Sequence, residues 1–137
     1  MQPIVLAAMY EYVQDDGGLP TLRRLFRQVD YRDLPITLSF FVVWSFELEP
    51  QELGRELQFV IRIVTPGGTA HDSKPRLMRL PGAGAGASTA WTVIEPYVVT
   101  FRKPGVHEFR LVAEGHPDAV VRIELARKPE GWIPLSE

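Results

Sequence analysis

Three histidines and the polar residues beside them are the side chains of this sequence whose types could support catalysis. His71, Asp72 and Ser73 supply the base, the acid and the hydroxyl that a hydrolase combines. They are consecutive in a predicted loop, whereas the members of a catalytic triad converge from separate elements and orient one another. A tripeptide of this composition is more often a turn. A hydrolase that uses the His71/Asp72 loop is therefore our third choice of function, and we expect no catalytic residue and no enzyme.

Metal and cofactor sites have equally little support. The histidines lack the His-x-His or His-x-x-x-His spacing of ligand pairs, and His107 is expected on a strand while His116 is expected in a turn. The glycine- and alanine-rich residues 81–89 are not followed by the Lys-Ser or Lys-Thr of a phosphate-binding loop, so a flexible connection is the better interpretation. We therefore predict no metal and no cofactor.

Glu95 is a carboxylate that the sequence places on an otherwise apolar strand face, beside Val93 and Tyr97. Such an environment could shift its pKa toward the range useful in acid–base catalysis. More often a charge at such a position indicates a sheet edge or a bulge, or it is paired with an arginine. Pro96, which cannot donate a hydrogen bond to a neighbouring strand, also favours an edge or a bulge.

The element that must position these groups most firmly is a long strand over residues 36–48. Period-two alternation puts four polar residues on one face and seven apolar ones on the other. Those seven are Ile36, Leu38, Phe40, Val42, Trp44, Phe46 and Leu48. We predict the central strand of the domain here. Its thirteen residues would span roughly 40 Å when extended, so we expect a bend or a bulge, and one strand that serves two sheets.

Weaker alternation predicts further strands in residues 4–13, 57–64, 76–80, 91–101, 107–113 and 121–125, separated by turns rich in glycine, proline and aspartate. This pattern predicts an all-β, immunoglobulin-like Greek-key β-sandwich of about seven to eight antiparallel strands. The segment between Leu22 and Val29 has helical spacing and is expected to form one short helix, with a strand as the alternative. We predict a single domain over residues 1–128 and a C-terminal tail over residues 129–137.

Composition excludes several classes of partner. Fifteen basic and seventeen acidic residues among 137 give a net charge of −2, with both signs scattered, so neither nucleic acid nor a membrane is an expected partner. Cysteine is absent, which excludes disulfides and thiolate chemistry. No apolar stretch approaches the length needed to cross a bilayer, and we expect a cytoplasmic protein.

Apolar residues on the second faces of the strands suggest a non-enzymatic protein-interaction or assembly module. The candidate partner surface comprises Val5, Met9, Phe41, Val43, Val60 and Trp132. The expected partner is a protein, with a homodimer as the simplest case, although the tail carrying Trp132 could instead cover the patch. The second choice is a carbohydrate-type ligand module, which would need Trp91, Tyr97 or Trp132 exposed as a platform. Because Trp91 and Tyr97 share a face with core residues, the core is favoured.

The order of several landmarks adds a resemblance. Residues 101–115 form a Pro-Gly turn and an alternating strand that ends at an acid-Gly turn, and residues 16–19, Leu34-Pro35 and residues 65–68 precede it in sequence. This order resembles an uncharacterised bacterial family of single-domain β-sandwiches, a domain of unknown function. The resemblance implies a small β-sandwich and supplies no site residues. It does not predict a tyrosine corner, because His107 stands where such hairpins commonly have tyrosine.

Overall fold

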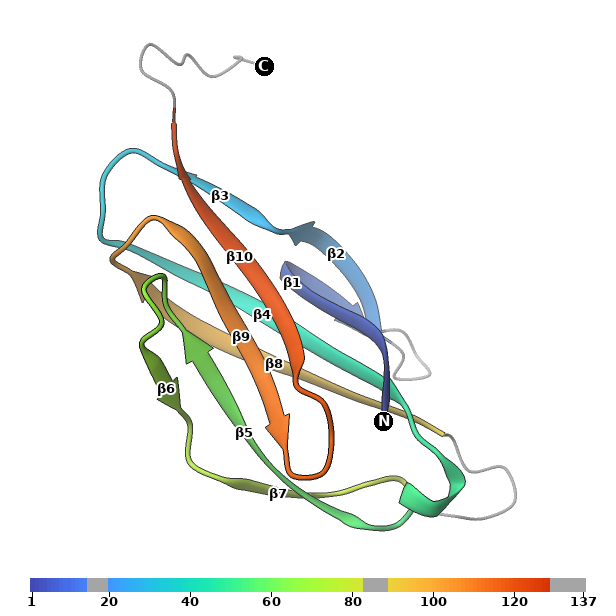
Figure 1. The fold of residues 1–137 in the computed structure, drawn as a ribbon. Helices are drawn as coiled ribbons and strands as arrows, with labels where there is room; N and C mark the ends of the chain where they lie inside the picture. Colours follow the sequence, from blue (N-terminus) through green and yellow to red (C-terminus); the bar gives the residue numbers. More distant parts are fainter. Residues whose placement is uncertain (15–19, 83–88, 129–137) are drawn as a thin grey trace.

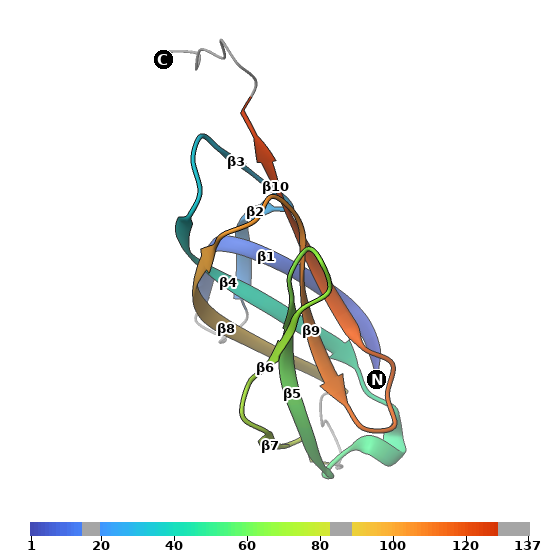
Figure 2. The same ribbon diagram turned by 60° about the vertical axis from the view of Figure 1, so that its left-hand side comes forward.

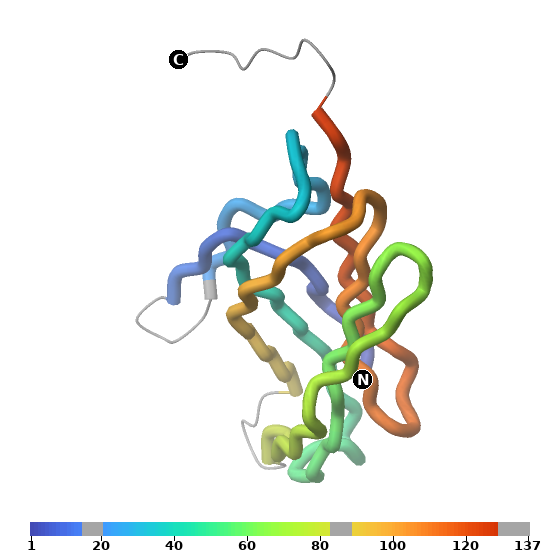
Figure 3. The backbone as a smooth tube through the Cα atoms, turned by 90° about the vertical axis from the view of Figure 1, so that its left-hand side faces the viewer, coloured from blue at the N-terminus to red at the C-terminus, as the bar shows by residue number. Residues whose placement is uncertain are grey.

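The protein is a sandwich of two packed β-sheets, described here in a computed structural model over residues 1–14, 20–82 and 89–128 (Figure 1). The first sheet has the order β2-β1-β4-β8, made of β2 (Pro20–Phe26), β1 (Gln2–Gln14), β4 (Ile36–Glu47) and β8 (Ala90–Phe101). The second has the order β3-β10-β9-β5-β6, made of β3 (Gln28–Tyr31), β10 (Ala119–Arg127), β9 (Gly105–Ala113), β5 (Glu56–Val64) and β6 (Ala70–Asp72), and β7 (Arg76–Arg79) also pairs with β5. Figure 3 shows the two layers side by side.

The strand order confirms the immunoglobulin-like prediction. The neighbours β1-β4-β8 in one sheet and β5-β9-β10 in the other correspond to strands A-B-E and C-F-G of the immunoglobulin fold. Of the pairs in the described residues, β3 with β10 is parallel and the others are antiparallel. The described residues form ten strands rather than seven or eight, since short edge strands such as β3 and β6 have too few residues to show a period.

Strand β4 is central to the first sheet, as its alternation predicts. It lies between β1 and β8 (Figure 2). Its register with β8 runs without a shift from Ile36 to Glu47. Both partners belong to one sheet, so the expectation that this strand serves two sheets is wrong, and the register with β8 shows no bulge. Its inward residues lie in the core, where the ring of Phe40 packs edge-on against Phe109 of the second sheet at 5.6 Å.

The predicted helix between Leu22 and Val29 is wrong, and the alternative prediction of a strand is confirmed. The segment belongs to β2 and β3, which lie in different sheets. Leu25 pairs with Met9 of β1 and is 56% exposed, whereas Phe26 packs against the core. The apolar residues are therefore divided between two sheet faces, and the helical spacing is a coincidence of sequence that strand pairing overrides.

His107 takes the part that a tyrosine plays in the corner of an immunoglobulin domain. It lies at the start of β9 and is buried, with 3% of its surface exposed. Its Nε2 lies 2.9 Å from the carbonyl oxygen of Lys103, four residues upstream, and its ring meets Phe101 edge-on at 4.9 Å. A side chain bound to the backbone just upstream is the feature that defines a tyrosine corner, so the corner is present here with imidazole in place of phenol.

A short 3-10 helix, η1 (Pro50–Glu52), is the single helix of the described residues. Glu52 completes a capping box with Glu49 and also binds the Met1 ammonium group at 2.9 and 3.1 Å. His116 approaches the same carboxylate at 3.8 Å. Glu52 therefore connects η1 to Met1, which precedes β1, and to the turn after β9, which carries His116. No helix that could cross a bilayer occurs in the part of the chain that is described.

Candidate functional site

Four of the six residues of the candidate partner surface lie together on one face. Val5, Met9, Phe41 and Val43 belong to β1 and β4, and Met9 is opposite Phe41 in the register. Their neighbours along each strand point into the core, so these four point away from the second sheet. Further apolar side chains on this side of the first sheet are those of Ala7, Leu25, Ile94, Pro96 and Val98, which lie beside these four in the register. We call these nine residues the outer face.

Part of the outer face is buried although it lies outside the core. Met9 is fully buried and Val43 is 2% exposed, yet neither belongs to the core between the sheets. Phe41 lies opposite Met9 in the register, and its ring meets Tyr12 edge-on at 5.1 Å. Leu25 and Val98, at 56% and 73% exposure, continue the apolar surface outward. The outer face is thus a continuous apolar patch rather than a scatter of single residues.

Polar groups border this patch. The Ser45 and Thr92 hydroxyls form a hydrogen bond of 2.8 Å at one side. Glu11 and Arg24 are 3.5 Å apart at another, and both are exposed. An apolar centre with a polar rim is the usual anatomy of a protein–protein interface.

Two residues of the candidate surface do not join the outer face. Val60 lies on β5 of the second sheet, opposite Val112, so its inclusion with the others is wrong. Trp132 lies outside the described residues, as do the turn at residues 15–19, the glycine-rich residues 83–88 and the tail. Sequence reasoning missed Leu25 and Ile94, because only the strand register places them beside Met9 and Val43.

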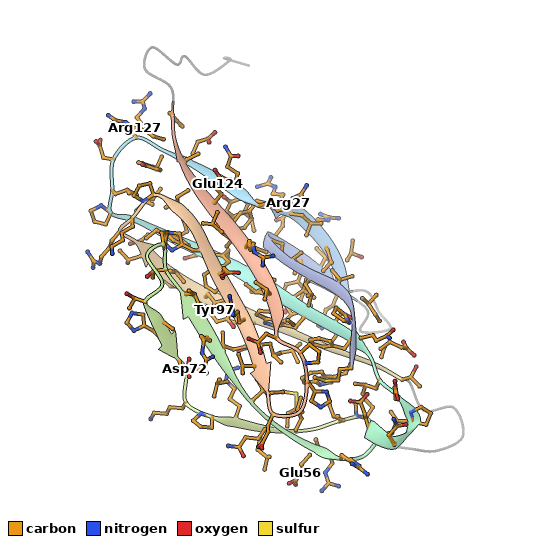
Figure 4. All side chains as sticks on the ribbon, viewed as in Figure 1. Arg27, Glu56, Asp72, Tyr97, Glu124 and Arg127 are labelled. Carbon is orange, nitrogen blue, oxygen red and sulfur yellow. The ribbon has the colours of Figure 1, made fainter. Side chains whose placement is uncertain are left out.

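The aromatic platform that a carbohydrate module needs is not formed by Trp91 and Tyr97. Trp91 is 6% exposed and its ring stacks on Phe46 at 5.6 Å. The ring of Tyr97 packs against Phe109 of the second sheet at 5.9 Å (Figure 4). The prediction that both face the core is confirmed.

The acid and the hydroxyl considered for a hydrolase are engaged elsewhere. His71 and Asp72 lie in β6 rather than in a loop. Figure 4 labels Asp72. Arg62 donates two hydrogen bonds to Asp72, at 2.7 and 3.1 Å, and hydrogen bonding by this side chain chiefly holds the pKa of that carboxyl below its usual range. The Ser73 hydroxyl accepts the Ile61 N–H at 2.9 Å and donates to the Lys74 carbonyl at 3.2 Å. Strand pairing therefore uses the acid and the hydroxyl that a triad would require.

The other histidines do not form a metal site with the acids near them. His107 is bound to the Lys103 carbonyl and His116 lies beside Glu52, as described above. Across residues 1–14, 20–82 and 89–128, no three His, Asp or Glu side chains converge on one point.

Glu95 lies on the inner face of β8, which is an edge strand of the first sheet, so the edge prediction is confirmed. Arg76 of β7 forms an ion pair with it across the gap between the sheets, and the guanidinium also lies 5.9 Å from the ring centre of Phe59. Three polar groups near this pair are buried and have no hydrogen-bond partner within the described structure: Glu95 Oε1, the Tyr97 hydroxyl and the Trp44 indole N–H. Burial, with a smaller contribution from the Glu95 charge, raises the pKa of Tyr97 far above its ordinary value.

The matching family model identifies the group to which the protein belongs. Residues 6–126 match a family of unknown function, DUF6941. The chain belongs to the DUF6941 family. This confirms the resemblance to an uncharacterised β-sandwich family, and the family description assigns no activity to its members. No curated protein matches the sequence of this DUF6941 protein.

Distant structural similarity links the DUF6941 protein to part of a larger enzyme. A beta-glucosidase from Listeria innocua matches with 10% identity and a TM-score of 0.44, over 75% of this chain and 15% of that one. The same enzyme in complex with gluconolactone matches with 10% identity and a TM-score of 0.43, over 88% of this chain and 16% of that one. The chain thus spans about a sixth of the enzyme's length, and a likeness at this level does not bear on activity.

Proposed function

We propose that the DUF6941 protein is a non-enzymatic assembly module in which two copies of the chain pack through their outer faces. The observation that carries this proposal is the continuous apolar patch, in which Met9 and Val43 are buried although they lie outside the core. A patch of this kind, bordered by polar residues, favours burial against another protein surface.

The register of the first sheet favours a second copy as the partner. Consider a twofold axis that lies between the two outer faces, perpendicular to the strands and level with Val43. This axis places the residues two positions before Val43 in one copy opposite the residues two positions after Val43 in the other copy. The large ring of Phe41 in one copy then faces the small Ser45 of the other, and Met9 faces Val5. Large residues opposite small ones allow two sheets to pack closely, at the spacing of about 10 Å that is usual for sheets packed face to face.

Light scattering coupled to size exclusion tests this proposal. We expect a dimer for the full chain and a shift to monomer for Leu25→Glu, because a charge at this exposed position cannot be buried without a partner. The matched control is Leu77→Glu, since Leu77 is similarly exposed, at 64%, but lies on β7 of the second sheet. A wild-type chain that is monomeric over the accessible concentrations would refute the proposal, as would equal dissociation by the control.

A chain that ends at Lys128 separates this proposal from its main competitor. If the tail covers the outer face, the full chain stays monomeric and only the shortened chain associates. If two outer faces pack together, both chains form dimers and Leu25→Glu dissociates both.

A further inference from the structure

A cavity of about 430 Å³ opens at one end of the sandwich, between the turn that joins β5 to β6 and the turn that joins β8 to β9. Its apolar wall includes Ile63, Val99 and Phe101, and the last of these belongs to the core. Cavities of this volume are of the size that binds small molecules.

The charged residues of the cavity are all basic. Arg102 and Lys103 line it together with His71 and His107, and no acidic side chain does so. In the described residues neither Arg102 nor Lys103 forms an ion pair, although many other arginines of this protein do. Two acids adjoin lining residues in sequence, and both are paired elsewhere: Asp72 with Arg62, and Glu108 with Arg110 and Arg122. Two exposed cations beside an apolar wall, without an acid to neutralise them, favour a ligand that carries a negative charge.

The two turns that border the cavity lie close together (Figure 1). Gly105 has a φ of 108°, and a Cβ at this position would lie 3.4 Å from the ring of Pro66. His107 holds the Lys103 carbonyl, and Thr65 closes the other turn by accepting the Gly68 N–H and donating its own N–H to the Thr69 carbonyl at 2.9 Å. The backbone that carries both cations is therefore anchored before any ligand arrives, which lowers the entropic cost of binding.

We propose that this cavity binds a small amphipathic carboxylate, with its anionic head between Arg102 and Lys103 and its apolar body against Ile63, Val99 and Phe101. Arginine suits this head because its guanidinium can donate two parallel hydrogen bonds to one carboxylate. The apolar wall distinguishes such a ligand from a bare inorganic anion. The proposal is independent of assembly, because the cavity lies between the sheets and the outer face points away from them.

Isothermal titration with octanoate, compared with its neutral analogue octanamide and with inorganic phosphate, tests the ligand class. We expect octanoate to bind, and we expect the affinity of octanamide to be lower by roughly tenfold or more. Phosphate alone should also bind more weakly than octanoate. Octanamide binding as tightly as octanoate would overturn recognition of the charge. Phosphate binding as tightly would overturn the role of the apolar wall, and no octanoate binding would overturn the site.

A double variant locates the binding. Arg102→Gln with Lys103→Gln should weaken octanoate binding by roughly tenfold or more, because the two charge-assisted contacts are lost. Both side chains are exposed and the Lys103 carbonyl is retained, so the variant is expected to fold, which circular dichroism checks. The control, Arg55→Gln with Lys74→Gln, makes the same charge change at exposed positions outside the cavity. Equal weakening in the control would mean that octanoate responds only to net charge, and the site would be wrong.

Discussion

Replacing Arg76 by alanine should destabilise the protein by more than the loss of an ordinary surface ion pair. The change removes the partner of Glu95, a carboxylate on the inner face of β8 whose side chain is 12% exposed. Its other oxygen has no hydrogen bond in the described structure, so the charge would be left without compensation between the sheets. The cost arises from the stranded carboxylate as much as from the lost contact.

The size of the effect follows from the exposure of the two side chains. Exposed pairs contribute about 0–1 kcal/mol, whereas removing one partner of a fully buried pair costs about 3–5 kcal/mol. Because the Arg76 side chain is 41% exposed and remains hydrated, an intermediate loss is expected. We place it at about 2–3 kcal/mol, which for a chain of this size lowers Tm by roughly 6–12 °C.

Urea unfolding followed by tryptophan fluorescence measures this loss. The matched control is Arg79→Ala on the same strand, which removes a pair with Glu56 whose side chains are 75% and 55% exposed. The control should cost no more than about 0.5 kcal/mol. Adding Glu95→Gln to Arg76→Ala should recover much of the stability, because a neutral amide costs less to bury. Equal losses in Arg76→Ala and Arg79→Ala would refute the view that Glu95 is desolvated.

Two further predictions concern pH. Burial, then the Glu95 charge, raises the pKa of Tyr97 above its ordinary value of 10.0, so the folded state holds this proton more tightly than the unfolded state. Its contribution is present below about pH 10 and is lost as pH rises further, and urea unfolding between pH 9 and about pH 12 should therefore show a steeper loss in wild type than in Tyr97→Phe. For Glu52, burial alone would raise the pKa, but the Glu49 N–H, the Met1 ammonium and His116 outweigh it and lower the pKa below 4.5. This contribution is present above about pH 4.5 and is lost on acidification, so Glu52→Gln should cost about 1–2 kcal/mol at pH 7 and little near pH 2.

Much of the fold follows from the local sequence pattern. The predictions that were wrong concern segments whose structure depends on strand pairing. The alternation of β4 is a property of its own residues, so its position and inward face could be predicted from them. The segment from Leu22 to Val29 could not, because its division between two sheets depends on partners in β1 and β10 that are distant in sequence. The Arg76–Glu95 pair was one of several explanations for a charge on an apolar face, and the sequence did not identify the arginine.

The same limit applies to the outer face and to the cavity. Val5, Met9, Phe41 and Val43 were identifiable as apolar residues on second faces, but only the register between β1 and β4 brings them together. The cations of the cavity precede Gly105 in a turn that the sequence did predict. Their apolar wall comes partly from β5, and the close approach of Gly105 to Pro66, which brings the two turns together, is not visible in a linear pattern.

The folding of a single chain does not account for the exposed part of the outer face. Leu25 and Val98, at 56% and 73% exposure, keep most of their side-chain surface in water and add little hydrophobic stabilisation in the isolated chain. Singly exposed apolar residues are normal on protein surfaces, but these two extend a patch that already buries Met9 and Val43 outside the core. Burial of the same patch in a dimer would remove Leu25 and Val98 from water as well. The hydrophobic stabilisation that Leu25 and Val98 lack in the monomer is therefore available through association. On this reasoning, Leu25→Glu must dissociate the dimer and must not lower the stability of the monomer.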